Sequence, residues 1–388
     1  MGAFQSIAGN DKILEGAYDL VINYIIQDNM NKIKVEILSD EYKQVSKEKL
    51  RGTIKEVQYN VKNYINQSRK LVSDANIDLV HVGREIVNGE NIIKKCNVYL
   101  PAGYDSQNSS VRYNVLYLLH GVGGDCNEWL SGNLQNILDK LIAKGDIEPL
   151  IVVLPEGRST SDWQDRSFNP EGINMLGFYY FDYEMRYDLI PFIESNFNTY
   201  SDIRDASPKG VDYSRKHRAI AGLSMGGMQT LNLTLGGYRC DSALYKGTSS
   251  SWKNGLDITV TTPGMLDLFA YAGAFSNAPT SSEGKILGAG LASSSYKLDL
   301  LYVTCGDADE IAFQAGFETA MNGLAVSAGD KLGDYYQVII KDGFHDFNVW
   351  DNGAYNFIRL CFRKAEDQSA ASDTECSTNC IREKITLI

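Results

Sequence analysis

Several residue types are scarce in this chain of 388 residues, and each scarcity excludes a class of protein. Its 7 cysteines are an odd number and too few for a disulfide-stabilised scaffold of this size. Basic residues are outnumbered, 37 against 49 acidic ones, which leaves a net charge of −12. This charge repels nucleic-acid phosphates and anionic lipid headgroups, so we expect no nucleic-acid or membrane partner. No run approaches the roughly 18–20 apolar residues of a membrane-spanning helix.

The ends of the chain carry neither a signal peptide nor a zinc-binding pattern. The N-terminus lacks the cationic start and apolar core of a signal peptide. Cys376 and Cys380 form a C-x₃-C pair, but no histidine or second cysteine pair lies near them, so a zinc site is not expected. The sequence leaves two alternatives open: a disulfide between Cys376 and Cys380, or two free thiols.

Short apolar runs alternate with amphipathic helical patterns from about residue 112 onward. Six runs have the nearly continuous apolar character of parallel strands covered on both faces: Val115–Leu119, Leu150–Leu154, Arg218–Leu223, Leu268–Ala274, Leu298–Thr304 and Tyr336–Lys341. Five helical patterns lie between or after them: Asn133–Lys144, Asp182–Phe197, Met225–Leu235, Ile311–Ala328 and Phe347–Lys364. The alternation predicts an α/β fold with a mostly parallel central sheet and helices on both faces.

The rest of the sequence predicts how the chain is organised. Residues 52–366 are expected to form one α/β domain, with antiparallel edge strands at Thr53–Tyr59 and Ile93–Leu100. Residues 1–51, with helical patterns at Ile13–Ile26 and around Glu41–Leu50, are expected to be an N-terminal helical extension, and residues 367–388 a C-terminal tail. Insertions are expected near 61–88, 158–176 and 236–264. The last two are rich in small polar residues and lack periodicity, which is typical of lids or binding loops.

A candidate nucleophile lies in the pentapeptide Gly222-Leu223-Ser224-Met225-Gly226. This G-x-S-x-G pattern stands directly after a predicted strand and directly before a predicted helix. A nucleophile on such a turn needs small neighbours, because the strained backbone must lift the hydroxyl clear of the strand. The pattern therefore predicts Ser224 as the nucleophile of acyl transfer.

A serine nucleophile needs a base, and the chain has only 4 histidines. His345 is the one that follows the last predicted strand of the α/β domain, where the base of such an enzyme stands. His81 lies in the irregular insertion, His120 in a glycine-rich loop, and His217 among basic residues that we interpret as a solvated charge cluster. The orienting acid should follow the penultimate strand, where chain order alone leaves Asp307 and Asp309 open.

Two backbone N–H groups must stabilise the oxyanion of the intermediate. One is expected from Met225, the residue after the nucleophile. The other is expected from Val122, in the loop His120-Gly121-Val122-Gly123-Gly124 after the strand Val115–Leu119. His120 would then orient this loop and not act as a base.

These motifs together resemble a known family. RAIAGLSMGG, VLYLLHGVGG, CNVYLPAGY and above all GFHDFNVW (Gly343–Trp350) look like carbohydrate esterase family 1, and closest to its feruloyl (cinnamoyl) esterases. The resemblance covers roughly residues 90–365 and implies the α/β-hydrolase fold. In the family pattern the acid stands in a G-x-x-D arrangement, which falls on Asp309. The long N-terminal extension and the insertions depart from the family.

The resemblance implies a secreted enzyme that hydrolyses hydroxycinnamoyl esters, such as ferulate esters on arabinoxylan or its oligosaccharides, without a metal or organic cofactor. An acetyl-xylan esterase and a cytoplasmic S-formylglutathione hydrolase of the same fold are the alternatives; the absent signal sequence leaves the compartment open, and oligomeric state is not predicted. Planar acids and sugars favour aromatic walls. The aromatic residues expected to contact substrate are Trp129, Phe178, Tyr179 and Trp350.

The first testable prediction concerns Ser224. Ser224→Ala should lower turnover by about 10⁶-fold, since loss of the nucleophile removes the acyl-enzyme route. A fluorophosphonate probe should label Ser224 alone, as read by peptide mass spectrometry. Labelling at another serine, or full activity of the variant, would contradict the assignment.

Overall fold

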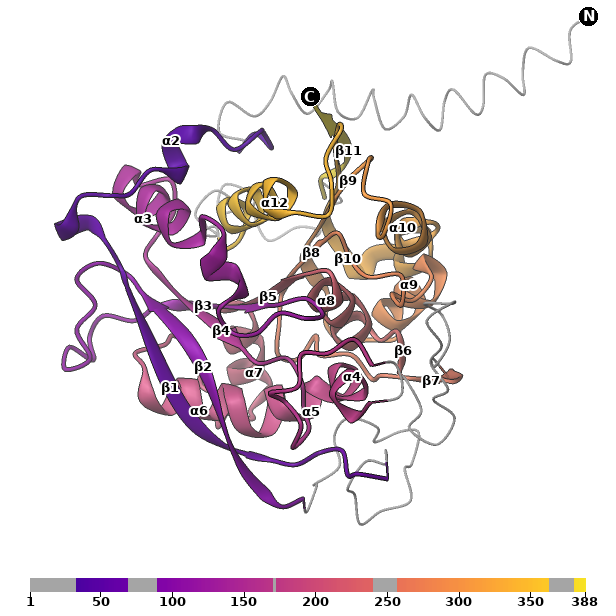
Figure 1. Cartoon of the computed structure of the whole chain (residues 1–388), viewed down its shortest axis with the longest axis horizontal. Coiled ribbons are helices and arrows are strands. Elements are labelled where there is room, and N and C mark those ends of the chain that lie inside the picture. The colour runs from indigo at the N-terminus through magenta and orange to yellow at the C-terminus, as the bar shows by residue number, and fades with distance from the viewer. Residues whose placement is uncertain (1–32, 69–88, 170–171, 240–256, 363–379) are drawn as a thin grey trace, which may run out of the picture.

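The computed structural model describes residues 33–68, 89–169, 172–239, 257–362 and 380–388. Within these residues one nine-stranded sheet has the order β1-β2-β4-β3-β5-β8-β9-β10-β11 (Figure 1). Its strands are β1 (Thr53–Lys62), β2 (Asn91–Leu100), β3 (Asn114–Leu119), β4 (Leu150–Pro155), β5 (Arg218–Leu223), β8 (Tyr271–Phe275), β9 (Leu298–Gly306), β10 (Leu332–Ile340) and β11 (Arg382–Leu387). The pairings that β2 makes with β1 and β4 are antiparallel and the others are parallel, as the sequence predicts.

Helices cover both faces of the sheet (Figure 1). On one face lie α3 (Leu134–Lys144) and α12 (Phe347–Leu360). The other face carries α4 (Ile173–Gly177), α5 (Phe181–Glu184), α6 (Ile190–Asn196), α8 (Met225–Leu235), α9 (Gly284–Ala292), α10 (Thr319–Met321) and α11 (Leu324–Ala328). The remaining short elements are α2 (Asp40–Lys43), α7 (Pro208–Arg215) and a two-stranded ribbon of β6 (Tyr238–Arg239) and β7 (Asp257–Thr261). No helix in the described ranges is long and apolar enough to cross a membrane.

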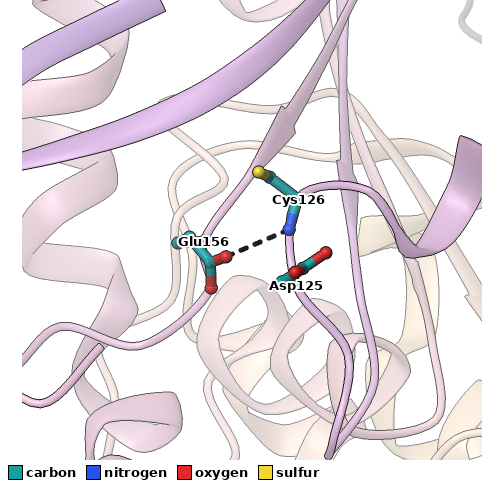
Figure 2. Close-up of side chains that lie close together, drawn as sticks. All are labelled: Asp125, Cys126 and Glu156. Atoms are coloured by element: carbon teal, nitrogen blue, oxygen red, sulfur yellow. Dashed lines mark hydrogen bonds between the residues drawn. The ribbon is translucent and has the colours of Figure 1, made fainter. Parts of the chain in front are cut away.

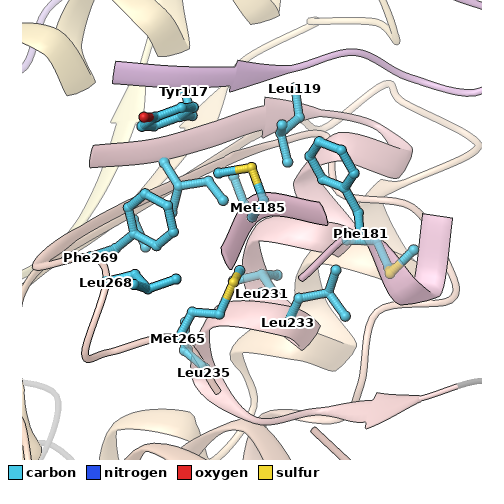
Figure 3. Close-up of a cluster of buried hydrophobic side chains, with 14 of the residues drawn as sticks. Tyr117, Leu119, Phe181, Met185, Leu231, Leu233, Leu235, Met265, Leu268 and Phe269 are labelled. Carbon is cyan, nitrogen blue, oxygen red and sulfur yellow. The ribbon is translucent and has the colours of Figure 1, made fainter. Parts of the chain in front are cut away.

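Successive side chains along a strand belong in turn to two separate hydrophobic cores. In β3, Val115, Tyr117 and Leu119 join the core beneath α8, whereas Leu116 and Leu118 join the core beneath α3 and α12. Figure 3 shows Tyr117 and Leu119 facing the leucines of α8 and the side chains of Phe181 and Met185. A strand that is buried on both faces has no polar positions, and this explains why the parallel strands read as continuous apolar runs.

Two predicted helices are interrupted, each for a local reason. The segment predicted as Asp182–Phe197 passes through a π-helical turn at Met185–Leu189 before α6, where Pro191 has no backbone N–H to donate. The segment predicted as Ile311–Ala328 divides at Gly323, whose φ of 77° belongs to the left-handed region. The strand predicted at Leu268–Ala274 begins only at Tyr271, because the preceding residues form a turn closed by bonds to Met265.

The two ends of the α/β domain differ most from prediction. Residues 33–51 are mostly irregular, with α2 and a 3₁₀ turn at Glu48–Leu50 in place of the predicted helix around Glu41–Leu50. They pack on the domain, since Val35 and Leu38 are buried in the core beneath α12. The prediction that residues 367–388 form a C-terminal tail is also wrong in part, because β11 within this segment pairs in parallel with β10. The helix predicted at Ile13–Ile26 and most of the 61–88 insertion lie outside the described residues.

Buried charge pairs join the helical layer to the sheet. At the start of β5, the Arg218 guanidinium donates to both carboxylate oxygens of Glu194 in α6, at 2.6 and 3.0 Å. Both side chains are almost completely buried. The interpretation of the basic cluster around His217 as solvated is therefore wrong for Arg218, and also for Arg215, which is 2% exposed. His217 itself is half-buried against two tyrosine rings, and its Nδ1 donates a hydrogen bond to Asn114 Oδ1 at 2.6 Å.

Arg218→Ala should destabilise the fold by about 3–5 kcal/mol, because it leaves the Glu194 carboxylate buried without its partner. The free energy of unfolding in urea measures the loss. Arg204→Ala is the matched control, since Arg204 pairs with Asp202 at the surface and should leave the unfolding midpoint nearly unchanged. Equal effects of the two substitutions would contradict this reading of the buried pair.

Candidate active site

The carboxyl ends of the parallel strands bring the predicted site residues to one edge of the sheet. The loop His120–Gly124 follows β3, Ser224 follows the adjacent strand β5, Asp309 follows β9 and His345 follows β10. The loop and the nucleophile meet directly: a Cβ on Gly121 would lie 3.1 Å from the Cβ of Ser224. In open α/β sheets ligands bind at this edge.

Ser224 stands on a strained turn between β5 and α8. Its φ of 51° and ψ of −114° are unusual for a residue with a side chain. The turn requires glycine on both sides, because a Cβ on Gly222 would lie 2.4 Å from the Gly226 carbonyl carbon, and one on Gly226 would lie 2.6 Å from the Leu119 carbonyl oxygen. The geometry is that of a nucleophile elbow, with the serine at the N-terminus of α8.

His345 and Asp309 are directly hydrogen-bonded. The distance from His345 Nδ1 to Asp309 Oδ2 is 2.7 Å. Since the carboxylate can only accept, Nδ1 carries the proton and Nε2 is left with its lone pair. The imidazole edge packs perpendicular to the Trp350 ring, at 5.2 Å between centroids, which restricts its rotation. The pair is arranged so that Nε2 can take a proton from a nucleophile.

Asp309 is held in its ionised form. The backbone N–H groups of Ile311 and Ala312 donate to its Oδ1 at 3.1 and 2.8 Å, while the Cys305 thiol lies 3.6 Å from Oδ2. Burial alone would raise the pKa of Asp309, but the hydrogen bond and charge of His345, with the Ala312 N–H and Ser276, hold it below its usual value. A carboxylate in this state can stabilise an imidazolium.

The neighbouring Asp307 has a different partner. Its Oδ1 accepts a hydrogen bond from the backbone N–H of Asp342 at 2.6 Å and so joins the loops after β9 and β10. The same two loops are pressed together at Gly306, where a Cβ would lie 2.1 Å from the Gly343 carbonyl oxygen. Of the two aspartates that chain order leaves open, Asp309 is the one that contacts His345.

The predicted oxyanion donors lie on the two elements that flank the serine. Among the hydrogen bonds of the described residues, none uses the N–H of Val122 or of Met225. The Val122 loop is shaped by Gly123, at a φ of 79°, and by Glu128, which accepts the Gly121 N–H at 2.6 Å. Both N–H groups therefore remain available to a ligand at this edge.

His120 is buried beneath this loop and bonds to backbone on both sides. Its Nδ1 donates to the Gly121 carbonyl at 2.7 Å, and its Nε2 accepts the Gly157 N–H at 3.0 Å. Both nitrogens are therefore occupied, as expected of a residue that orients the loop. The other histidine, His81, lies outside the described residues.

The aromatic residues expected to contact substrate are all buried and packed against other groups of the protein. Trp129 is 1% exposed and donates from Nε1 to the Leu119 carbonyl at 2.9 Å. Phe178 and Tyr179 are buried in the core, and the Phe178 ring packs edge-on against His120. Trp350 packs against His345. All four side chains are buried in the structure, and their contact with a substrate stays a prediction.

Sequence reasoning missed Ser276 near the site. Ser276, after β8, has a φ of 45° and lies 3.8 Å from the Cys305 thiol beside Asp309. Its place at the carboxyl end of a central strand was the available signal.

The C-x₃-C pair can be followed only in part. Cys380 forms no disulfide within the described residues, while Cys376 lies outside them.

One cluster has side chains that could ligate a metal. A carboxylate oxygen of Asp125, the Cys126 sulfur and a carboxylate oxygen of Glu156 lie within 4.8 Å of one another (Figure 2). Their partners are already within the protein: Glu156 accepts the Cys126 N–H at 3.1 Å, and Asp125 pairs with Arg166 at 2.8 Å. Burial raises the pKa of the Cys126 thiol to about 12, which disfavours the thiolate that binds metals. The donor set does not fit a metal ion.

Residues 92–239 match the family model described as "Putative esterase". The endo-1,4-beta-xylanase Y of Acetivibrio thermocellus is 41% identical over 149 residues, which are 38% of this chain and 12% of that protein. The endo-1,4-beta-xylanase/feruloyl esterase of Xylanibacter ruminicola is 36% identical over 170 residues, 43% of this chain and 20% of that protein. The chain thus spans at most a fifth of the length of these curated relatives.

A solved structure of a ferulic acid esterase from the anaerobic fungus Anaeromyces mucronatus, in complex with ferulic acid, is similar with a TM-score of 0.57. The identity is 19%, and the match covers 85% of this chain and 98% of that chain. This likeness confirms the α/β-hydrolase fold. With the sequence matches, it confirms the resemblance to feruloyl esterases that the motifs indicate.

Asp309→Asn should lower kcat by about 10³–10⁴-fold, because His345 loses its orienting and charge-compensating partner. Asp307→Asn is the matched control and should cost far less, since Asp307 bonds to backbone between two loops. Steady-state kinetics of both variants decide between the two aspartates. A larger loss in Asp307→Asn would transfer the acid's role to that residue.

The same pair predicts the pH profile. Because its pKa is lowered, Asp309 stays ionised throughout pH 5–8, above its ordinary value of about 3.9. Protonation of Asp309 should therefore add no step to kcat/KM in this range, and because a base must be neutral to accept the serine proton, kcat/KM should rise with pH. A flat profile with rate-limiting chemistry would contradict His345 as the base.

Proposed function

We propose that the chain is a serine esterase that hydrolyses hydroxycinnamoyl esters, such as feruloyl esters, of plant cell-wall polysaccharide through an acyl-enzyme. The observation that carries this proposal is the combination of the strained Ser224 turn with the hydrogen-bonded His345–Asp309 pair at one sheet edge. In this proposal Ser224, His345 and Asp309 are the catalytic residues. The N–H groups of Val122 and Met225 form the oxyanion hole.

In the first half of the reaction, Ser224 Oγ attacks the ester carbonyl carbon while its proton passes to His345 Nε2. The carbonyl oxygen becomes an oxyanion that accepts hydrogen bonds from the two backbone donors. Asp309 stabilises the imidazolium through Nδ1–H. Collapse of the intermediate breaks the bond to the sugar oxygen, which leaves as an alcohol after taking the proton from Nε2.

In the second half, a water molecule replaces the alcohol. Nε2 removes a proton from this water as its oxygen attacks the acyl carbon, and the oxyanion hole stabilises the second intermediate in the same way. Its collapse returns the proton to Ser224 and releases the free acid. The protein groups present complete the cycle, so the proposed reaction uses no cofactor.

Two observations support a hydroxycinnamoyl acyl group: the names of the relatives, and the exposed apolar side chains beside the His345–Asp309 pair. Two of the similar proteins carry feruloyl or ferulic acid esterase in their names. Beside the His–Asp pair, Phe344 is 61% exposed and Ile311 is 47% exposed. An exposed aromatic ring next to the base can stack on a planar cinnamoyl acid. A polymeric substrate cannot enter a cell, so we place the enzyme outside it.

Methyl ferulate should be preferred over methyl acetate by about 5–150-fold in kcat/KM, because burial of a planar ring contributes about 1–3 kcal/mol. Phe344→Ala should reduce this preference by about 2–10-fold. Val326→Ala is the control, since Val326 is 84% exposed and belongs to α11, outside the loops that carry Ser224, Asp309 and His345. Equal turnover of both esters by the unmodified enzyme would make an acetyl esterase the better assignment.

A further inference from the structure

The turn that follows β4 lies between the two halves of the oxyanion site. Glu156 and Arg158 are both almost fully buried. Arg158 donates to the Glu156 carboxylate at 3.1 Å and to the Gly124 carbonyl at 2.9 Å. Glu156 in turn accepts the backbone N–H of Cys126 at 3.1 Å (Figure 2). Two backbone groups of the loop that carries Val122 are therefore held by one buried ion pair.

The residue between them binds both neighbouring elements. The Gly157 N–H donates to Nε2 of His120, while the Gly157 carbonyl accepts from Gln229 Nε2 in α8 at 2.8 Å. His120 opens the oxyanion loop, and α8 begins with Met225. The 156–158 turn thus connects the element that carries one proposed oxyanion donor to the element that carries the other.

The turn is itself anchored to the sheet and the helical layer. Lys94 in β2 donates to the carbonyls of Glu156 and Arg158 at 2.9 and 2.8 Å, and pairs with Glu184 in α5 at 2.7 Å. Both side chains of that pair have no exposed surface. The Arg158 guanidinium also lies over the Phe178 ring, 4.9 Å from its centroid. With so many bonds inside the core, the turn has little freedom to shift.

We propose that Glu156 and Arg158 are positioning residues that set the spacing of the Val122 and Met225 N–H groups for the oxyanion. The inference rests on the proposed function and assigns these two side chains a role in it. Their effect acts through residues 120–126, because their side-chain bonds join them to each other and to this loop, including an approach of 3.4 Å between Glu156 Oε2 and His120 Nε2. Oxyanion stabilisation depends steeply on donor placement, so a small displacement of the loop lowers kcat and leaves substrate affinity nearly unchanged.

The experiment compares p-nitrophenyl acetate with its thionoester, in which sulfur replaces the carbonyl oxygen. A sulfur anion is larger and a weaker hydrogen-bond acceptor, so its hydrolysis depends less on the two N–H donors. Arg158→Met should lower kcat for the oxygen ester by about 10–100-fold, a fraction of the 10²–10³-fold cost of losing one donor. KM should change less than twofold, and the thionoester should lose less than threefold.

Three variants complete the design. Arg158→Lys keeps one donor toward the Gly124 carbonyl and should recover part of kcat. Glu156→Gln removes the charge from the pair. It should shift the ratio of kcat for the oxygen ester to kcat for the thionoester in the same direction as Arg158→Met. Arg166→Met is the matched control: it removes the same charge beside Asp125 in the same loop, but Arg166 is 57% exposed and should leave the ratio unchanged.

Active sites are counted by fluorophosphonate labelling of Ser224, so a misfolded fraction drops out of every rate. If Arg158→Met yields no folded protein, Arg158→Lys and Glu156→Gln carry the comparison. Equal losses on both esters, or no loss, would overturn the positioning role. Failure of the proposed function looks different, because the unmodified enzyme would then hydrolyse neither ester through Ser224.

Discussion

The close approach of α8 to β3 and β5 is the constraint on which the rest of the site depends. A side chain at Gly222 or Gly226 would overlap backbone atoms, so only glycine allows the helix to begin directly above the strand. Ser224 is thereby held at a positive φ, with its side chain at the N-terminus of α8. The partial positive charge at this end of a helix favours a developing oxyanion.

Buried charge is unusually concentrated in one helical segment. Asp182, Glu184 and Glu194, all in the stretch that spans α5 and α6, pair with Arg239, Lys94 and Arg218 respectively. Each pair is almost fully buried, and each cation comes from a strand. Such pairs contribute little net stability compared with apolar packing, but a wrong placement leaves a charge without a partner. They therefore specify how this segment lies against the sheet and the β6–β7 ribbon, and through Lys94 they fix the 156–158 turn.

Buried aromatic residues pack against the groups that form the candidate active site. Trp350 restricts the His345 ring, Trp129 binds the end of β3 through its N–H, and Phe178 packs beneath His120 and Arg158. Rigid buried rings hold a catalytic group in place at a low cost in conformational entropy. The large apolar side chains exposed beside the His345–Asp309 pair are Phe344 and Ile311, which we propose as substrate contacts.

The sequence by itself determined the features that depend on neighbours along the chain. Continuous apolar runs predicted the parallel strands, and β5 and α8 begin and end as predicted because a glycine-bounded turn separates two clear periodicities. The G-x-S-x-G turn between a strand and a helix singled out Ser224, and chain order singled out His345. The family resemblance, not the spacing, favoured Asp309 over Asp307.

Only the tertiary structure decided which groups meet across the chain. The contact of Asp309 with His345 spans 36 positions, and the contacts that join Arg158 to Gly124 and Gln229 to Gly157 span 34 and 72. The addition of β11 beside β10 and the docking of residues 33–51 are of the same kind. Local periodicity reports which face of an element is buried but not which partner covers it, because that choice is made by the packing of the whole chain.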